Sequence, residues 1–336
     1  MKGFLLLCVI VVPGCLAARQ PPLQRRGKPL SDKDSAVWRY VDPFIGTTKS
    51  DVETRWGDEG GTYPGAVAPS GFMQLSPETR PPGQGGYDYH DRTIYFFSCT
   101  HHNSGFPGGS SGRLYIMPLR DTGKSGRPFS HAAEAAEPGY YRVRLEDDGT
   151  VVEAVATTRA GAFRIRYPAG TIPRLFVSDS GDGKSAFDLS ENYTDRQAVK
   201  GGQVYSFTVS ASARWIFVRV STSTVNAQSA RNNIAVECRS SFDELRPRVR
   251  AQWQHVLSVA QVQDTCRENK VVFYTALYHS LLVPWIISDV ERNYRGADGR
   301  IHRQSEMNMG IFRPGTASGL YTRCSLFFTR TKNPTW

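Results

Sequence analysis

The sequence predicts a mainly β chain in which a β-sandwich comes first and helices follow. From about Trp38 to Val236, short runs of alternating apolar and polar residues are separated by Gly, Asp, Pro or Ser, which is the pattern of strands joined by turns. Many such strands in succession are typical of a β-sandwich. After Ser240 apolar residues recur at spacings of three and four, and this period predicts helices.

The strand pattern is clearest in six segments. In the segment 214–222, alternation places Trp215 and Phe217 on one face and Ile216, Val218 and Val220 on the other. The other five segments are 140–145, 151–158, 162–168, 174–180 and 203–211.

Two helices are expected in the second part. Ser240 or Ser241 caps the first, and Pro247 would kink it or delay its start. The second is expected over residues 268–285. The apolar residues of the first are Phe242, Leu245, Val249, Trp253, Val256 and Leu257, and the faces of the second include Val272, Ala276, Tyr278, His279 and Leu282.

The positive charge of the chain is confined to its two ends. The net charge is +10, from 41 basic and 31 acidic residues. Residues 1–30 hold five basic residues and residues 311–336 hold four, with no acids in either, so 41 − 9 = 32 basic residues face 31 acidic ones in between. A body this close to neutral predicts no phosphate-binding face, and therefore no nucleic-acid partner.

The N-terminus has the pattern of a secretory signal. Lys2 precedes an apolar run and then small residues, and the run is too short to span a bilayer. Residues 1–18 are predicted to be the signal peptide and residues 19–37 a disordered spacer. The chain is therefore expected to be secreted or periplasmic, with lipid attachment at Cys15 as the alternative.

The remaining cysteines do not form a disulfide framework. Cys99, Cys238 and Cys266 are an odd set at irregular spacing. Buried free thiols are expected, with a Cys238–Cys266 pair as the alternative. Asn192 begins an Asn-Tyr-Thr glycosylation sequon, which has meaning only in a eukaryotic secretory pathway.

The stretch from Asp42 to Pro118 is the most informative. It contains "DPFIGT", "GGTYPGAVAPSGFMQLSPET" and "GGYDYHDRTIYFFSCTHH". Glycine and proline at this density describe shaped loops, and these loops carry aromatic, acidic and histidine side chains. Aromatic faces beside hydrogen-bonding groups suit a sugar ring, which has both apolar faces and hydroxyls.

This stretch resembles the N-terminal signature of glycoside hydrolase family 92, the inverting, calcium-dependent exo-α-mannosidases. Ser70 and Phe96 stand where the family usually has Phe and Gly. Further on, "FYTALYHSLL" and "SDVERNYRGADG" resemble the first inward helix and the next motif of the family's helical toroid. The resemblance covers residues 38–306 and implies a β-sandwich at 38–238, then a linker helix and the start of an incomplete (α/α)6 toroid at 239–310.

Residues 311–336 are expected to be an aberrant tail produced by a frameshift. The family continues with a Ser-Leu-Trp-Asp block, where this chain has "IFRPGTASGLYTRCSLFF". A shift of two nucleotides within Pro314 permits Trp and then Asp from the following codons. The partner helices of a C-terminal domain would then be missing, which predicts partial exposure of Trp253, Phe273, Leu277, Leu281 and Trp285 and a tendency to aggregate.

The resemblance implies hydrolysis of terminal α-mannosidic bonds in mannose-containing glycans. Inverting glycosidases need a carboxylic acid and a carboxylate base. The family's later motifs carry both, together with the calcium site, and none of those motifs occurs here. No catalytic residue and no metal ligand is therefore assigned, and the chain alone is expected to be inactive. A carbohydrate-binding β-sandwich module and an inert fragment are the alternatives.

Six residues are candidates for substrate binding. Asp91 and Thr100 could instead satisfy loop backbone groups, as short polar side chains often do, and Tyr87 could belong to a half-buried strand pair. Arg295 could bind sugar hydroxyls or form an interdomain ion pair. The full set is Tyr87, Asp91, Thr100, His101, Arg295 and Asp298.

Overall fold

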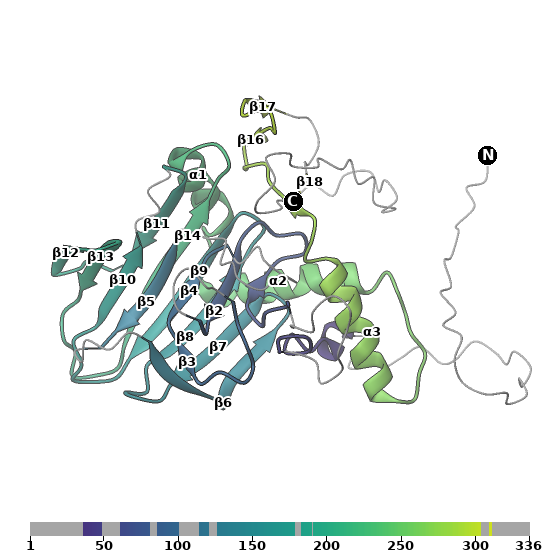
Figure 1. Cartoon of the computed structure of the whole chain (residues 1–336), viewed down its shortest axis with the longest axis horizontal. Coiled ribbons are helices and arrows are strands. Elements are labelled where there is room, and N and C mark those ends of the chain that lie inside the picture. The colour runs from purple at the N-terminus through teal and green to yellow at the C-terminus, as the bar shows by residue number, and fades with distance from the viewer. Residues whose placement is uncertain are drawn as a thin grey trace, which may run out of the picture. The chain divides into compact units, whose positions relative to one another are not determined.

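The computed structural model describes most of the chain from Ala36 onward (Figure 1). The described residues all belong to one compact unit, Ala36–Trp336. None of the helices found in them is long and apolar enough to cross a membrane. The described ranges are 36–48, 61–80, 86–100, 114–120, 126–178, 183–189, 191–303 and 309–310.

Two seven-stranded sheets form the β-sandwich (Figure 1). The first has the order β1-β2-β4-β5-β10-β13-β12. Its strands are β1 (Ala66–Val67), β2 (Gln74–Glu78), β4 (Phe96–Ser98), β5 (Tyr115–Leu119), β10 (Arg174–Ser178), β13 (Gly202–Ser206) and β12 (Asp195–Val199). All the pairings in this sheet are antiparallel.

The second sheet has the order β11-β14-β9-β8-β7-β6-β3 and is also antiparallel. Its strands are β11 (Ser185–Leu189), β14 (Arg214–Thr222), β9 (Ala160–Tyr167), β8 (Val151–Ala156), β7 (Tyr140–Leu145), β6 (Arg127–Glu137) and β3 (Thr93–Ile94). The register of β6 against β7 shifts between Phe129 and Glu134, and this β-bulge becomes important at the candidate site.

The core lies between the two sheets. Phe97 of β4 packs edge-on against Phe163 of β9, with ring centroids 6.1 Å apart. Leu75 of β2 comes so close to Gly161 of β9 that a Cβ there would lie 2.6 Å from the leucine Cδ1. Glycine at position 161 thus lets β2 and β9 approach, which is one reason the interior is closely packed.

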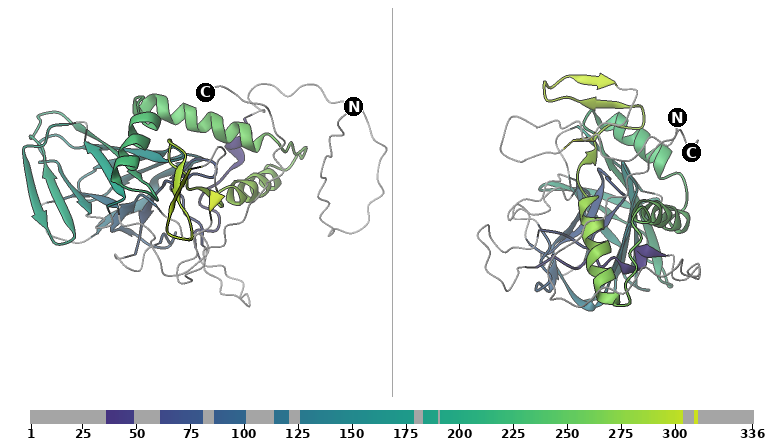
Figure 2. Two further views of the ribbon diagram at one scale, coloured as in Figure 1. Left: turned by 90° about the horizontal axis from the view of Figure 1, so that it is seen from above. Right: turned by 90° about the vertical axis from the view of Figure 1, so that its right-hand side faces the viewer.

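In the described ranges, three α-helices and one 3₁₀-helix accompany the sandwich (Figure 2). The helices α1 (Ala227–Glu237), α2 (Phe242–Leu257) and α3 (Arg267–Ser280) follow the last sandwich strand, and η1 (Val37–Tyr40) precedes the first. Helix α1 contacts β14, β11 and β9, while α2 contacts β8 and η1. Asn226 caps α1 by accepting from the Ser229 amide at 2.9 Å.

Helix α2 begins as the sequence predicts, at a capping box made by Ser241 and Glu244. Pro247 lies inside the helix and does not end it. On the buried side of α2, Trp253 donates its indole N–H to the Val67 carbonyl at 2.7 Å. This bond and the contacts of Val249 with the β6–β7 turn dock α2 onto the sandwich.

The chain after α3 is tied back to the sandwich loops. Ser70 donates its amide to the Leu281 carbonyl at 2.9 Å and accepts from the Ile286 amide at 2.9 Å. In the described part of the chain two small sheets follow: β15 (Trp285–Ile286) pairs with β18 (Met309–Gly310), and between them β16 (Asn293–Arg295) and β17 (Ile301–Arg303) form a hairpin.

The mainly β prediction is confirmed, and the six predicted strands correspond to β7, β8, β9, β10, β13 and β14. In β14 the alternation holds, because Ile216, Val218 and Val220 are buried. Helix α1 was not predicted, since residues 227–237 were assigned to the β region. Cys99 and Cys238 are buried free thiols, as expected, whereas Cys266 is free but only half-buried.

The predicted exposure of the helix faces is mostly wrong. Trp253 is fully buried, Trp285 is 2% exposed and Leu281 is 8% exposed. Trp253 packs on Tyr278 of α3 and bonds to Val67 of β1, and Trp285 clusters with Phe72 of the β1–β2 loop. Phe273 is 40% exposed, as expected. The second helix is also shorter than predicted and ends at Ser280.

Candidate functional site

Tyr87 lies on the loop between β2 and β3, but its side chain points into the protein. Only 5% of the residue is exposed. Its hydroxyl donates to the two carboxylate oxygens of Glu134 on β6, at 3.1 and 2.9 Å. Tyr87 therefore anchors the loop to the second sheet, and its ring is covered.

Glu134 is the centre of a buried hydrogen-bond network. Besides Tyr87, it accepts from the Tyr141 hydroxyl at 2.5 Å, and the His131 Nδ1 atom lies 2.7 Å from its carboxylate. Its side chain is fully buried. Burial raises the pKa of Glu134, and the hydrogen bonds from Tyr141, His131 and Tyr87 offset only part of that rise. The same environment raises the pKa of Tyr87 and Tyr141.

Sequence analysis did not identify His131 and Glu134 as site residues. They are three residues apart in one strand, so regular alternation would place their side chains on opposite faces. The register shift in β6 between Phe129 and Glu134 removes that alternation and lets both meet. The bulge has no signature in the run "SHAAEAAE", and no sequence signal marks these two residues.

Tyr89 is the accessible aromatic residue of this loop. It is 39% exposed and stacks on His131, with ring centroids 4.0 Å apart and an interplanar angle of 13°. Phe44 touches it edge-on at 5.8 Å, and the Tyr89 amide donates to the Thr47 carbonyl at 3.2 Å. These contacts hold a partly exposed ring in a fixed orientation, which is what stacking on a sugar requires.

Asp91 lies in a polar network on the same loop. Its Oδ2 atom accepts from the Thr79 hydroxyl at 2.6 Å, and that hydroxyl oxygen accepts from the Asp88 amide at 2.9 Å. Partial burial alone would raise the pKa of Asp88, but hydrogen bonds from the His90 amide and the Thr48 hydroxyl lower it overall. The carboxylate of Asp91 is thus engaged in holding the loop.

Thr100 lies at the other end of β2 from Asp91. It is 5% exposed and forms a parallel bridge with Gln74, the first residue of β2, whereas Asp91 is bonded to Thr79, the residue after β2. At about 3.4 Å per residue, Gln74 and Thr79 are roughly 17 Å apart. Asp91 and Thr100 are therefore too far apart to bind the same hydroxyl. His101 lies outside the described residues.

Arg295 and Asp298 belong to the β16–β17 hairpin. The guanidinium of Arg295 donates to the Gly299, Thr224 and Val225 carbonyls at 2.7, 3.1 and 3.3 Å. These bonds fasten the hairpin to the chain after β14. The carboxylate of Asp298 lies 2.9 Å from the His302 ring, and the bond to His302 is the main cause of its lowered pKa.

The loop at 42–48 connects these sandwich loops to α3. The Asp42 amide donates to the Thr275 hydroxyl at 2.9 Å. Gly46 has φ = +80°, and a Cβ there would lie 3.0 Å from the Thr62 hydroxyl and 3.9 Å from the His279 ring. Burial lowers the pKa of His279. From the family resemblance, we expect the helical domain to lie on this side of the sandwich.

The described residues do not fit a calcium ion. Calcium takes six to eight oxygen ligands in most protein sites, and no group of three or more His, Cys, Asp or Glu side chains that could hold a metal is found in the described ranges. The loop carboxylates of Asp88 and Asp91 are already hydrogen-bonded to threonines.

Asn192, the first residue of the glycosylation sequon, is exposed just before β12.

Comparison with family models decides the classification. The model of the "Glycosyl hydrolase family 92 N-terminal domain" matches residues 40–257. The chain belongs to glycosyl hydrolase family 92. The model of the "Glycosyl hydrolase family 92 catalytic domain" matches residues 229–313. No curated protein sequence matches this family 92 chain significantly.

Solved structures with the same fold include several family 92 enzymes. The α-mannosidase BT3965 of Bacteroides thetaiotaomicron is 24% identical, with a TM-score of 0.69, and the match covers 82% of this chain and 45% of that one. The glycosyl hydrolase ccman5 is 26% identical, with a TM-score of 0.70 over 81% and 44% of the two chains. The inverting mannosidase BT2199 of B. thetaiotaomicron is 20% identical, with a TM-score of 0.71 over 84% and 45%. This family 92 chain therefore spans less than half the length of each of these enzymes.

Proposed function

We propose that this chain is the N-terminal part of an exported α-mannosidase that removes terminal α-linked mannose from glycans with inversion. The observation that carries the proposal is family membership, since the family 92 model covers residues 40–257. Similar structures include an inverting mannosidase, and one α-mannosidase of the same fold was solved with mannoimidazole. Export is supported by the signal pattern at residues 1–18.

Within this function the described loops would form one wall of the mannose site. Tyr89 is the best candidate for direct contact, because its ring is partly exposed and held by His131 and Phe44. Tyr87 and Asp91 would act by fixing the loop that carries Tyr89. Thr100, Arg295 and Asp298 remain candidates on other segments, and His101 remains a candidate from the sequence alone.

The catalytic acid and base would be supplied by segments that carry the family's later motifs, and calcium would be bound there as well. Inversion requires two carboxyl groups about 6.5–9.5 Å apart with room for a water molecule. Of the carboxylates on or beside the 86–91 loop, Glu134 is fully buried, and Asp88 and Asp91 are bonded to threonine hydroxyls. None of the three is assigned as the acid or the base. We expect no hydrolysis by these 336 residues alone.

Mannose release from a panel of α-linked mannobioses tests this expectation. The purified chain should release none, while BT2199 in the same buffer should release mannose with inverted configuration, visible by NMR. Mannose release by this chain, at a rate proportional to its concentration, would contradict the assignment of acid and base to other segments.

The alternative function is a carbohydrate-binding module, and the exposed ring of Tyr89 favours it. Titration with methyl α-mannoside separates this alternative from an inert fragment. A module should show saturable binding that Tyr89→Ala removes, whereas an inert fragment should show no saturation with either protein.

A further inference from the structure

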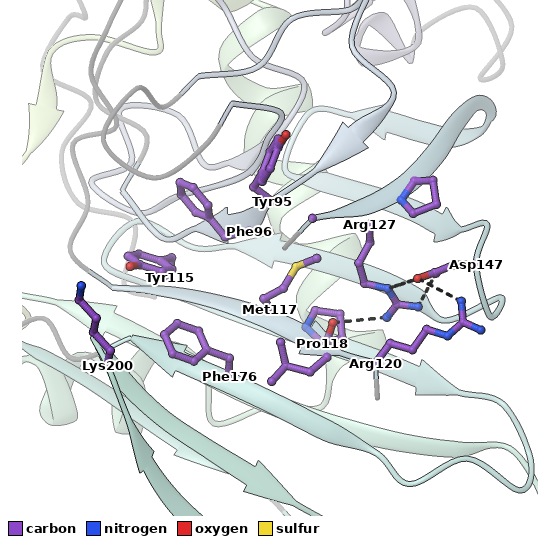
Figure 3. A pocket seen from close by; sticks show the side chains of 13 residues that line it. Tyr95, Phe96, Tyr115, Met117, Pro118, Arg120, Arg127, Asp147, Phe176 and Lys200 are labelled. Atoms are coloured by element: carbon purple, nitrogen blue, oxygen red, sulfur yellow. Dashed lines mark hydrogen bonds and ion pairs between the residues drawn. The ribbon is translucent and has the colours of Figure 1, made fainter. Parts of the chain in front are cut away.

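A pocket of about 440 Å³ lies on the first sheet (Figure 3). This volume is within the range of roughly 300–1,000 Å³ that small-molecule sites occupy. Strands β4, β5 and β10 contribute its aromatic wall, and the start of β6 and the turn after β7 contribute the charged wall. No described residue of the 86–91 loop lines it, so it is separate from the candidate mannose site.

The aromatic wall belongs to the outer face of the sheet. Phe97 and Ile116 are paired across β4 and β5 and point to the core, where Phe97 meets Phe163. Their neighbours Phe96 and Tyr115 therefore point outward. Met117 and its partner Phe176 on β10 share the orientation of Tyr115.

The rings on this face form a connected row. The centroids of Phe96 and Tyr115 are 4.7 Å apart, and those of Tyr115 and Phe176 are 5.9 Å apart. Phe96 is only 2% exposed and forms the floor, whereas Tyr115 and Phe176 are half-buried and accessible. Gly202 makes room for Phe176, because a Cβ at that position would lie 2.8 Å from the ring.

The pocket has one positive charge more than the acids beside it neutralise. Arg127 is 3% exposed and is paired with Asp147 and Asp148, with nitrogen–oxygen distances of 2.5 Å. Arg120 is 3.8 Å from Asp147, which already binds Arg127. Lys200, on the β12–β13 turn at the other end of the pocket, has no ion pair with any residue that the structure describes. The pocket and its edge thus contain three cations, Arg120, Arg127 and Lys200, and two carboxylates, Asp147 and Asp148.

We propose that this pocket binds a sugar residue that carries a negatively charged substituent. The apolar face of the sugar ring would pack on Tyr115 and Phe176, which lie side by side at the opening. The substituent, a carboxylate or a phosphate ester, would pair with the ammonium of Lys200, which lies at the same end of the pocket as Tyr115 and Phe176. This site lies outside the proposed mannosidase cleft and does not depend on mannosidase activity.

Ligand-observed NMR titration of the full 336-residue chain tests the proposal. Gluco-configured probes avoid the proposed mannose site: glucose, glucose 6-phosphate, glucuronate and inorganic phosphate. At least one of the two acidic sugars should bind about tenfold more tightly than glucose, the effect of one charge-assisted contact. Whichever acidic sugar binds identifies the substituent, and inorganic phosphate should bind more weakly than that sugar.

Two variants locate the binding. Lys200→Gln should bring the affinity for the acidic sugar close to that for glucose, and Phe176→Leu should weaken binding of the acidic sugar at least severalfold while the melting temperature stays near that of the wild type. Lys270→Gln on α3 is the charge-matched control and should leave binding unchanged. The proposal is overturned if no acidic sugar binds, if glucose binds as tightly, if inorganic phosphate binds as tightly, or if Lys270→Gln has the same effect as Lys200→Gln.

Discussion

At the scale of single residues, the family signature is used mainly to build loops. The hydroxyl of Tyr87 is hydrogen-bonded to the buried carboxylate of Glu134, and the carboxylate of Asp91 is hydrogen-bonded to the hydroxyl of Thr79. Tyr89 of the signature stays accessible and stacks on His131. Residue types were sufficient to predict a loop with aromatic and acidic side chains. Which of them is buried depends on partners in β6 that only the folded chain brings near.

Removing Glu134 tests its role in holding the loop. Glu134→Ala leaves three buried groups without their partner, and each such loss costs about 1–3 kcal/mol. We expect the free energy of unfolding, measured with urea, to fall by about 3 kcal/mol. This value is near the lower end of the sum of the three losses, because the remaining groups of the network can rearrange. Glu146→Ala in the nearby turn, where the side chain is exposed, should change it by less than about 0.5 kcal/mol. An unchanged stability of Glu134→Ala would refute the network.

The lowered pKa of His279 predicts a pH dependence of stability. Because burial keeps His279 neutral in the folded state, the unfolded chain takes up a proton near pH 6.5 while the folded chain does not. Stability should therefore fall as the pH drops from 6.5 toward the folded pKa. His279→Gln should remove this part of the decline in urea melts between pH 7 and 5. His255→Gln, at an exposed position of α2, should not remove it, and equal slopes for wild type and His279→Gln would contradict the prediction.

At the scale of elements, strands with a regular alternation were predictable and irregular elements were not. Residues 214–222 carry a strict two-residue period, and β14 has those bounds. Helix α1 was missed because Ile234 and Val236 are the only large apolar residues in its sequence, AQSARNNIAVE, and their spacing of two is that of a strand. Its place depends on Asn226 as a cap and on contact with β14. The bulge in β6 likewise depends on contacts between elements and not on a local sequence pattern.

The β6–β7 turn fixes the docking of α2 and gives an element-scale prediction. Gly139 has φ = +86°, and a Cβ there would lie 2.3 Å from Val249 of α2. Gly139→Ala should reduce the free energy of unfolding by about 3 kcal/mol, because it combines a left-handed backbone with overpacking. Gly170→Ala is the matched control, since Gly170 has φ = +74° with open space around it, and should cost only about 1–2 kcal/mol. Equal losses in the two variants would show that α2 does not press on this turn.

At the scale of the whole molecule, the β-sandwich and the first part of the helical domain are united by buried contacts. Arg159 of the sandwich donates to the Ser288 carbonyl and pairs with Glu237 of α1. Trp253 and Trp285 are covered by sandwich loops. The prediction of partial exposure failed for Trp253, Leu281 and Trp285 because it counted only the helices of the missing domain as possible partners. Residues 311–336, for which the sequence predicts a frameshift, lie outside the described residues.

The coding DNA beyond the codon for Gly310 tests the central claim most directly, namely that this family 92 chain is the N-terminal part of an inverting α-mannosidase. Read two nucleotides out of frame from Pro314, it should encode Trp-Asp and then the motifs that carry the acid, the base and the calcium ligands. If no frame downstream encodes Trp-Asp and those motifs, the claim is contradicted.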